Sequence, residues 1–175
     1  MTAPPAVFLD RDGTLHVDMV RSVDLARLQL TPGAAEAMRL WREAGWRIVL
    51  VTNQSGIGRG LYTVADMERF HEELQARLGA RFDAVYFCPH LPEDGCACRK
   101  PKPGMLLQAM RERAIDPARA VFVGDAASDV QAAKAAGVRS VAVAPPGSPA
   151  ALAGPDHVAP DLAEAARWTL ARQKP

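Results

Sequence analysis

The chain has 175 residues, 49% of them hydrophobic and 23% charged, so it can bury one core and we expect a single domain over residues 1–175. Its formal net charge of +1 argues against nucleic acid or a membrane surface as a partner, and no segment carries the run of about 20 apolar residues that a membrane span needs. The first residues lack the pattern of a signal peptide, which predicts a cytoplasmic protein.

Five short apolar runs alternate with helical patterns along the chain. Each run is apolar at successive positions, which is typical of strands covered by helices on both faces. The runs cover residues 7–9, 46–51, 84–87, 120–123 and 140–144. This alternation predicts an α/β fold, a Rossmann-like three-layer sandwich with a mostly parallel sheet.

The helical patterns carry start and stop signals. Thr31 followed by Pro32 predicts the start of the first helix, with Thr31 as a possible N-cap. Thr63 and Asp66 form a shortened capping box for the second, which ends at Gly79. A third helix begins at Pro103, a fourth covers about 128–136, and a last covers about 162–171 after a loop at 145–155.

Polar residues follow four of the five expected strands. In such sheets, ligands bind beyond the carboxyl ends of the strands, so these residues are the first candidates for a site. They are Asp10 and Asp12, Thr52 and Asn53, Cys88 and His90, and Gly124 and Asp125.

The first of these groups, in "DRDGT", suits a hard divalent cation such as Mg²⁺. A cation would offset the repulsion between Asp10 and Asp12, and Asp125 can complete its site. Asp10 can then act as a nucleophile that forms an aspartyl-phosphate, while Asp12 acts as general acid and base. Thr52 and Lys100 can stabilise the charge on the transferred phosphoryl group.

Other groups could also contact an anion. The amide of Asn53 can donate a hydrogen bond, and Lys102 is an alternative to Lys100 as the positive charge. The glycines of "TNQSGIGRG" would let backbone N–H groups approach the anion. They are Gly56, Gly58 and Gly60.

Four stretches in this order resemble the haloacid dehalogenase superfamily: "DRDGT", Thr52, Lys100 and "GDAASD". The resemblance covers residues 7 to about 144. It implies a phosphatase in which Asp10 is the nucleophile and Asp12 the acid/base, with Thr52 and Lys100 on the phosphoryl group. It also implies Mg²⁺ held by Asp10, the Asp12 carbonyl and Asp125.

Two further features follow from the same resemblance. Asp129 would lie next to the metal, as a water-mediated ligand or as a neighbouring acid. No stretch between the motifs is long enough for a large cap domain, so the site should be open.

The segment "CPHLPEDGCACRK" contains three cysteines and one histidine at short spacing. Three thiolates and an imidazole can form a closed tetrahedral zinc site, which would be structural and would make this a zinc-binding loop. The ligands would be Cys88, His90, Cys96 and Cys98. The alternative is a reduced, surface-exposed cysteine cluster.

This loop resembles one subgroup of the superfamily, the D-glycero-D-manno-heptose 1,7-bisphosphate phosphatases and histidinol-phosphate phosphatases. "TNQSGIGRG" and "RKPKPGM" look more like the heptose enzymes. The resemblance implies removal of the 7-phosphate in the pathway to bacterial surface polysaccharide. We expect a monomer that acts on a small phosphorylated metabolite. Histidinol phosphate is the alternative substrate. A non-catalytic, zinc-braced binding module is the less favoured alternative, because Asp10 and Asp12 are both intact.

Substrate contacts are expected from three segments near the motifs. Besides Thr52 and Lys100, the candidates are Asp18, Arg21, Asn53, Gln54, Ser55 and Arg99. The segment "HVDMVRSV" departs from many heptose enzymes, since His16 replaces an asparagine and a Gly-Tyr pair is missing. Ala126 stands where many members have a lysine. His16 is a candidate substrate contact, whereas His71 and His157 are expected to be solvated or partly packed.

Overall fold

The computed structural model describes residues 3–172, and its centre is a six-stranded sheet in the order β3-β2-β1-β4-β5-β6. All five pairings are parallel. The strands are β1 (Ala6–Leu9), β2 (Arg47–Asn53), β3 (Ala84–Cys88), β4 (Ala120–Gly124), β5 (Arg139–Val143) and β6 (His157–Ala159). The chain moves outward from β1 to β3 and then returns to β4 beside β1. The carboxyl ends of β1 and β4 therefore form the switch point at which such sheets bind ligands.

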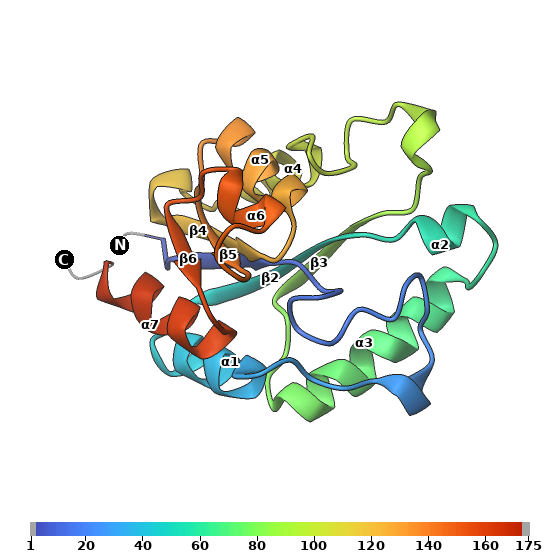
Figure 1. Ribbon diagram of the computed structural model, residues 1–175, viewed down its shortest axis with the longest axis horizontal. Helices are drawn as coiled ribbons and strands as arrows, with labels where there is room; N and C mark the ends of the chain where they lie inside the picture. The colour runs from blue at the N-terminus through green and yellow to red at the C-terminus, as the bar shows by residue number, and fades with distance from the viewer. Residues whose placement is uncertain (1–2, 173–175) are drawn as a thin grey trace.

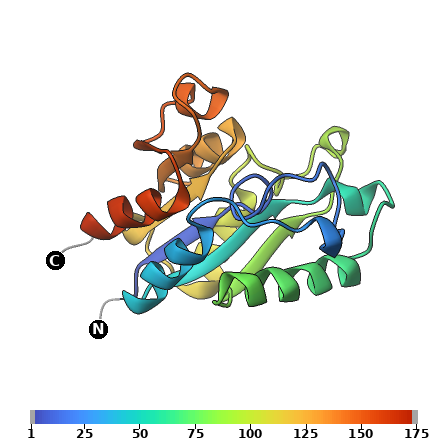
Figure 2. The ribbon, with the colours of Figure 1, turned by 60° about the horizontal axis from the view of Figure 1, so that its bottom comes forward.

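Helices cover both faces of the sheet (Figures 1 and 2). The helices α1 (Ala34–Glu43), α3 (Val64–Leu78) and α7 (Leu162–Ala171) lie on one side, and α4 (Gly104–Arg113), α5 (Ala127–Ala135) and α6 (Pro149–Leu152) lie on the other. The short elements are α2 (Ser55–Gly58), η1 (Leu25–Arg27), η2 (Pro92–Asp94) and η3 (Pro117–Arg119). The expected three-layer α/β sandwich is confirmed.

Alternation along the central strands supplies both layers of the core. In β1, Val7 and Leu9 belong to the apolar cluster beneath α1, α3 and α7, whereas Ala6 and Phe8 belong to the cluster beneath α4 and α5. All four side chains are fully buried. Because both faces of the strand are apolar, β1 is held rigidly, and the loop that follows it starts from a fixed position.

Local signals predicted some element ends correctly and others incorrectly. The capping box of Thr63 and Asp66 is present at the start of α3. The prediction for Thr31 was wrong, because Gly33 is the N-cap of α1 and the Thr31 hydroxyl instead donates to the Thr14 carbonyl at 2.5 Å. The loop expected at 145–155 contains α6, and β6 was missed because three residues are too few to show a pattern.

None of the helices among residues 3–172 combines the length and the apolar character that crossing a bilayer requires.

Candidate active site

The loop after β1 is fixed against the end of β4. The Asp10 amide donates to the Val123 carbonyl at 3.1 Å, and the Thr14 hydroxyl donates to Oδ1 of Asp125 at 2.7 Å. Gly13 has φ +81°, and a Cβ atom at this position would lie 2.2 Å from Oδ2 of Asp125. Only glycine allows this approach, so the Asp-Gly-Thr sequence is what brings Asp10 and Asp125 together.

Three carboxylates gather at this switch point, those of Asp10, Asp125 and Asp129, with ligand atoms within 4.8 Å of one another. The ammonium of Lys100 lies among them, 2.8 Å from Oδ1 of Asp10 and 2.7 Å from Oδ1 of Asp129. It also donates to the Val51 carbonyl at 2.9 Å. With every group ionised, three acids and one ammonium leave a charge of −2, which suits one divalent cation.

The pKa values of these groups reflect the same excess of negative charge. Burial, followed by repulsion from Asp129, raises the pKa of Asp10 to about 8, although Lys100 partly opposes the shift. Burial raises the pKa of Asp125 to about 6, although the Thr14 hydroxyl opposes it. Burial alone would lower the pKa of Lys100, but Asp10 and Asp129 hold it above its usual range. The cluster fits a bound cation, which would let both Asp10 and Asp125 ionise at neutral pH.

The Asp12 side chain points into a different set of contacts. Arg11 donates to both its oxygens, at 2.9 and 3.1 Å, and the Gln54 amide donates to Oδ2 at 2.7 Å. Nε2 of His16 lies 3.2 Å from Oδ1. Burial acts to raise the pKa of Asp12, but His16 and Arg11 together hold it well below its usual range. Asp12 can therefore reach a metal at the cluster only through its main-chain carbonyl.

A cavity of about 220 Å³ opens beside Asp12. Its lining includes five of the residues that the sequence nominated for substrate contact. The full lining is Asp12, Asp18, Val20, Arg21, Asn53, Gln54, Ser55, Gly56 and Tyr62. Arg99 and Lys100 line a second cavity of about 220 Å³ next to the cysteine loop. The two basic residues Arg21 and Arg99 thus lie in separate hollows.

Two of the nominated side chains are already used inside the protein. Asn53 donates to the Lys100 carbonyl and accepts from the Lys100 amide, both at 3.1 Å, so it fixes the backbone at this lysine. The Gln54 amide donates to Thr52 and Asp12 and accepts from Arg11 and Tyr62, and its side chain is buried. Gln54 therefore orients neighbouring side chains.

The glycines after β2 serve packing. The Gly58 amide donates to the Pro89 carbonyl at 3.0 Å, and the Gly60 amide donates to the Ile57 carbonyl at 2.9 Å. A Cβ atom at Gly56 would lie 2.1 Å from the ring of Tyr62. The amides of Gly58 and Gly60 are therefore bonded within the protein, which removes these two as donors to an anion.

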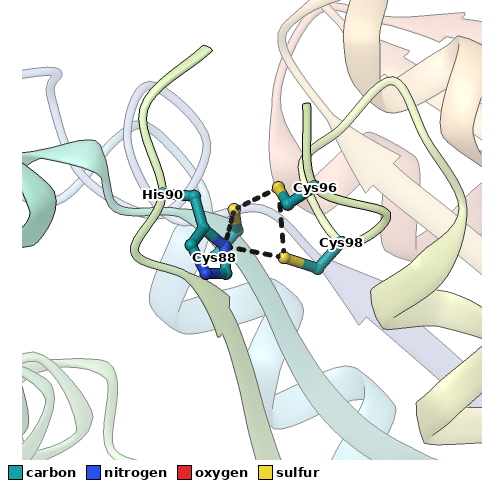
Figure 3. A group of neighbouring side chains, drawn as sticks. All are labelled: Cys88, His90, Cys96 and Cys98. Atoms are coloured by element: carbon teal, nitrogen blue, oxygen red, sulfur yellow. Dashed lines mark hydrogen bonds between the residues drawn. The ribbon is translucent and has the colours of Figure 1, made fainter. Parts of the chain in front are cut away.

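The cysteine loop folds into a four-membered cluster at the end of β3 (Figure 3). Cys88 Sγ lies 3.6 Å from Cys96 Sγ and 3.5 Å from His90 Nδ1, and Cys98 Sγ lies 3.4 and 3.2 Å from the same two atoms. Zinc–sulfur bonds of about 2.3 Å give tetrahedron edges of about 3.5–3.8 Å, close to these spacings. The cluster therefore fits one zinc ion with no open position.

Neighbouring groups hold this loop in shape. The Lys102 ammonium donates to the carbonyls of Gly95 and Cys96 at 2.8 and 2.7 Å. Lys102 is thus committed to the loop, and Lys100 is the lysine at the acid cluster. Burial raises the pKa of Cys88 to about 12, so its thiolate form needs a nearby cation.

The sequence analysis missed a buried network behind Asp12. Arg11 is fully buried, and its Nη1 lies 3.2 Å from Nε2 of His71, which is itself 5% exposed. His71 was expected to be solvated or partly packed. It is more deeply buried than that, and its contact with Arg11 was not predicted. His16 was a candidate substrate contact, but its side chain is fully buried and contacts Asp12 instead.

His157 is half-buried, in agreement with the expectation that it is solvated or partly packed. It stacks on Trp168, with ring centroids 4.8 Å apart, and its Nε2 lies 2.9 Å from Glu164.

A comparison with protein families matches residues 17–137 to the haloacid dehalogenase-like hydrolase model. The chain belongs to the haloacid dehalogenase-like hydrolases. The resemblance to this family is thereby confirmed. Phosphatases of this family hydrolyse phosphoric monoesters with Mg²⁺, in agreement with the acid cluster described above.

Two curated relatives of this hydrolase are named for the same activity. A D-glycero-beta-D-manno-heptose-1,7-bisphosphate 7-phosphatase from Yersinia pestis is 40% identical over 97% of both chains. The same enzyme from Escherichia coli (strain K12) is 39% identical, over 95% of this chain and 88% of the relative.

A solved structure is similar to nearly the whole of this chain. A D,D-heptose 1.7-bisphosphate phosphatase from B. bronchiseptica, complexed with magnesium and phosphate, superposes with a TM-score of 0.86 and is 36% identical. The match covers 96% of this chain and 99% of that one.

Proposed function

We propose that this hydrolase removes the 7-phosphate from D-glycero-D-manno-heptose 1,7-bisphosphate. The observation that carries the proposal is the position of Asp10, whose carboxylate contacts the Lys100 ammonium and lies with two further carboxylates at the switch point of the sheet. The relatives supply the substrate class. The place of such an enzyme is the route to nucleotide-activated heptose for bacterial surface polysaccharide.

In the first step, an Asp10 oxygen attacks phosphorus and the bond to the sugar oxygen breaks. The leaving oxygen takes a proton from Asp12, which must be protonated in the complex with substrate, although His16 and Arg11 favour its ionised form in the free protein. Lys100 lies 2.8 Å from Asp10 and can offset negative charge on the phosphoryl group. Thr52 follows β2 at the same edge, where its hydroxyl can donate to a phosphoryl oxygen.

In the second step, a water attacks the phosphorus of the aspartyl-phosphate and gives its proton to Asp12. The bond between phosphorus and Asp10 breaks, which releases phosphate, restores the Asp10 carboxylate and leaves Asp12 protonated, as it was before the first step. One residue thus serves as acid and then as base, so its carboxyl must face the same reaction centre in both steps.

The carboxylates of Asp10 and Asp125 and the carbonyl of Asp12 would hold Mg²⁺, with Asp129 beside it. The bound ion supplies charge neutralisation that lets an anionic phosphate approach an anionic nucleophile. Thr14 orients the Asp125 carboxylate through its 2.7 Å hydrogen bond. Cys88, His90, Cys96 and Cys98 would hold a structural Zn²⁺, which orders the loop that carries Arg99 and Lys100.

A bisphosphate needs a second anion site. Arg21 lines the cavity beside Asp12 and Arg99 lines the one next to the cysteine loop, so either arginine can meet the distal phosphate, while Asp18 and Ser55 offer contacts to sugar hydroxyls. Histidinol phosphate carries an amino group, and two arginines near its non-phosphate end would repel that group. The arginines therefore favour the bisphosphate.

We propose further that the protein is a single-domain cytoplasmic monomer that acts on a free metabolite, with no nucleic-acid or membrane partner. The near-zero formal net charge of +1 argues against a nucleic-acid or membrane partner. The three cysteines have a geometry that suits metal ligation, and metal ligation requires the reduced thiols of a cytoplasmic protein.

The test is phosphate release from a panel of monoesters with Mg²⁺ present. The proposal expects heptose 1,7-bisphosphate to have the highest kcat/KM, and it expects the single variants Arg99→Ala and Arg21→Ala to lower this value more than that for p-nitrophenyl phosphate. Highest kcat/KM with histidinol phosphate would reject the sugar. Release from no substrate would favour the non-catalytic alternative, and Asp10→Asn is the inactive control.

A further inference from the structure

Behind the acid/base carboxylate lies a buried arginine that the chemistry above does not use. Arg11 is fully buried, and its guanidinium contacts four side chains. Two bonds go to Asp12, at 2.9 and 3.1 Å, one goes to Gln54 Oε1 at 2.8 Å, and Nη1 lies 3.2 Å from His71 Nε2. Its Cζ lies 4.9 Å from the centre of the Phe70 ring.

The direction of each hydrogen bond is determined by chemistry. A guanidinium can only donate, so Nε2 of His71 must be an acceptor and the ring must be neutral. Burial, followed by the charge of Arg11, lowers the pKa of His71 to about 3, which agrees with a neutral ring. His71 thus holds the far side of Arg11 from helix α3 without competing for the charge of Asp12.

Gln54 connects this network to the phosphate-binding side. Its Oε1 accepts from Arg11 and from the Tyr62 hydroxyl, which leaves its Nε2 to donate to Asp12 at 2.7 Å and Thr52 at 2.8 Å. The acid/base carboxylate and the threonine that faces the phosphoryl group are therefore set relative to each other by one buried amide.

We propose that Arg11 is a positioning residue that holds the Asp12 carboxylate in line with the leaving oxygen, and that His71 and Gln54 hold Arg11. The role rests on the proposed phosphatase function. A bidentate pair fixes the plane of a carboxylate as well as its distance, which a lysine cannot do. Within the first step, a misaligned Asp12 slows only a reaction in which the leaving oxygen must receive a proton.

That condition gives a selective readout in the first turnover. A sugar alkoxide must be protonated as it leaves, whereas p-nitrophenolate leaves without a proton. In Arg11→Lys, we expect the first-turnover rate with an alkyl phosphate to fall about 100-fold, within the range for loss of general acid catalysis. The first turnover of p-nitrophenyl phosphate should fall less than about threefold, with a burst of p-nitrophenolate, because water attack still needs Asp12.

His71 supplies a second pair of variants, for the case in which Arg11→Lys does not fold. His71→Leu removes the acceptor and should give the same selective loss at about tenfold, while His71→Gln keeps an acceptor and should recover to within about threefold of wild type. Arg69→Lys is the control, because Arg69 lies exposed on the same helix as His71 and its ion pair within residues 3–172 is with Asp66.

The alkyl phosphate used is whichever member of the panel the wild type hydrolyses. A wrong substrate assignment therefore shows in the substrate preference of the wild type, whereas a wrong role for Arg11 shows only in the rates of the variants. Equal losses for the two leaving groups would overturn it, because a role in folding or in phosphate binding slows both. Unchanged rates in the Arg11 and His71 variants would also overturn it, as would a wild type that cleaves p-nitrophenyl phosphate but no alkyl phosphate.

Discussion

The ammonium of Lys100 lies 2.7 Å from Oδ1 of Asp129, and both side chains are almost completely buried. Lys100 follows the cysteine loop, whereas Asp129 lies in the first turn of α5. Because Lys100 also contacts Asp10, this ion pair joins the cysteine loop and the start of α5 to the nucleophile. The Lys100 ammonium, which would stabilise the phosphoryl group, is thus held in place by Asp129, and Asp129 is not the nucleophile.

Asp129→Asn should therefore weaken both stability and catalysis. The substitution leaves a buried ammonium with one acid partner instead of two, and we expect the free energy of unfolding to fall by about 3 kcal/mol. Chemical denaturation measures this change. In the double variant with Lys100→Met, part of the loss should be recovered, since both buried charges are then gone. Simple additivity of the two losses would argue against a direct pair.

Zinc removal should destabilise the wild type but not a variant that already lacks the site. We expect elemental analysis to find about one zinc per chain in the wild type and much less in Cys98→Ser. A strong chelator should lower the melting temperature of the wild type toward that of Cys98→Ser and leave the variant unchanged. Wild-type protein purified without chelators and free of zinc would contradict the tetrahedral site.

Acid should destabilise the fold through His71. Its folded-state pKa of about 3 lies below the usual value of 6.5, so between these values the unfolded chain binds a proton that the folded chain does not. Stability from the neutral ring is complete above about pH 6.5 and is lost as the pH falls. Relative to His71→Gln, the wild type should lose about 2 kcal/mol between pH 8 and pH 5 in denaturant titrations. Parallel pH curves for the two proteins would show that His71 is charged or exposed.

Val20→Gly should stabilise the protein. Val20 has φ +52° at the rim of the Asp12 cavity, a conformation that costs a β-branched residue about 1–2 kcal/mol, and its side chain is 72% exposed. Relief of this strain outweighs the extra backbone entropy of glycine, for a net gain of about 0.5–1 kcal/mol.

The control for this change is Val85→Gly, at an exposed position in strand β3, which should destabilise the protein by about 1 kcal/mol. Thermal melts of both variants would decide the matter. A loss of stability in Val20→Gly would mean that the valine side chain makes a contact worth more than the strain.

The parts of the site that the sequence predicted well lie next to regular elements. Asp10 and Asp125 directly follow β1 and β4, so the fold class alone placed them at one edge of the sheet. The cysteine loop was equally accessible, because His90 and Cys96 are only six residues apart and local spacing limits where they can meet. The contacts of Gln54 were harder to predict, because its side-chain amide bonds to the side chains of Arg11, Asp12 and Tyr62, which come from two other segments.

The sequence by itself determined the parallel α/β architecture, the acids that follow its strands and the spacing of the metal-binding loop, because these depend on apolar periodicity and on neighbours along the chain. Only the tertiary structure decided what each acid contacts. Arg11 and His71 are 60 positions apart, and their pairing requires α3 to pack beneath the loop after β1. No local pattern encodes that contact, since it depends on the order of the strands and the packing of the layers between them.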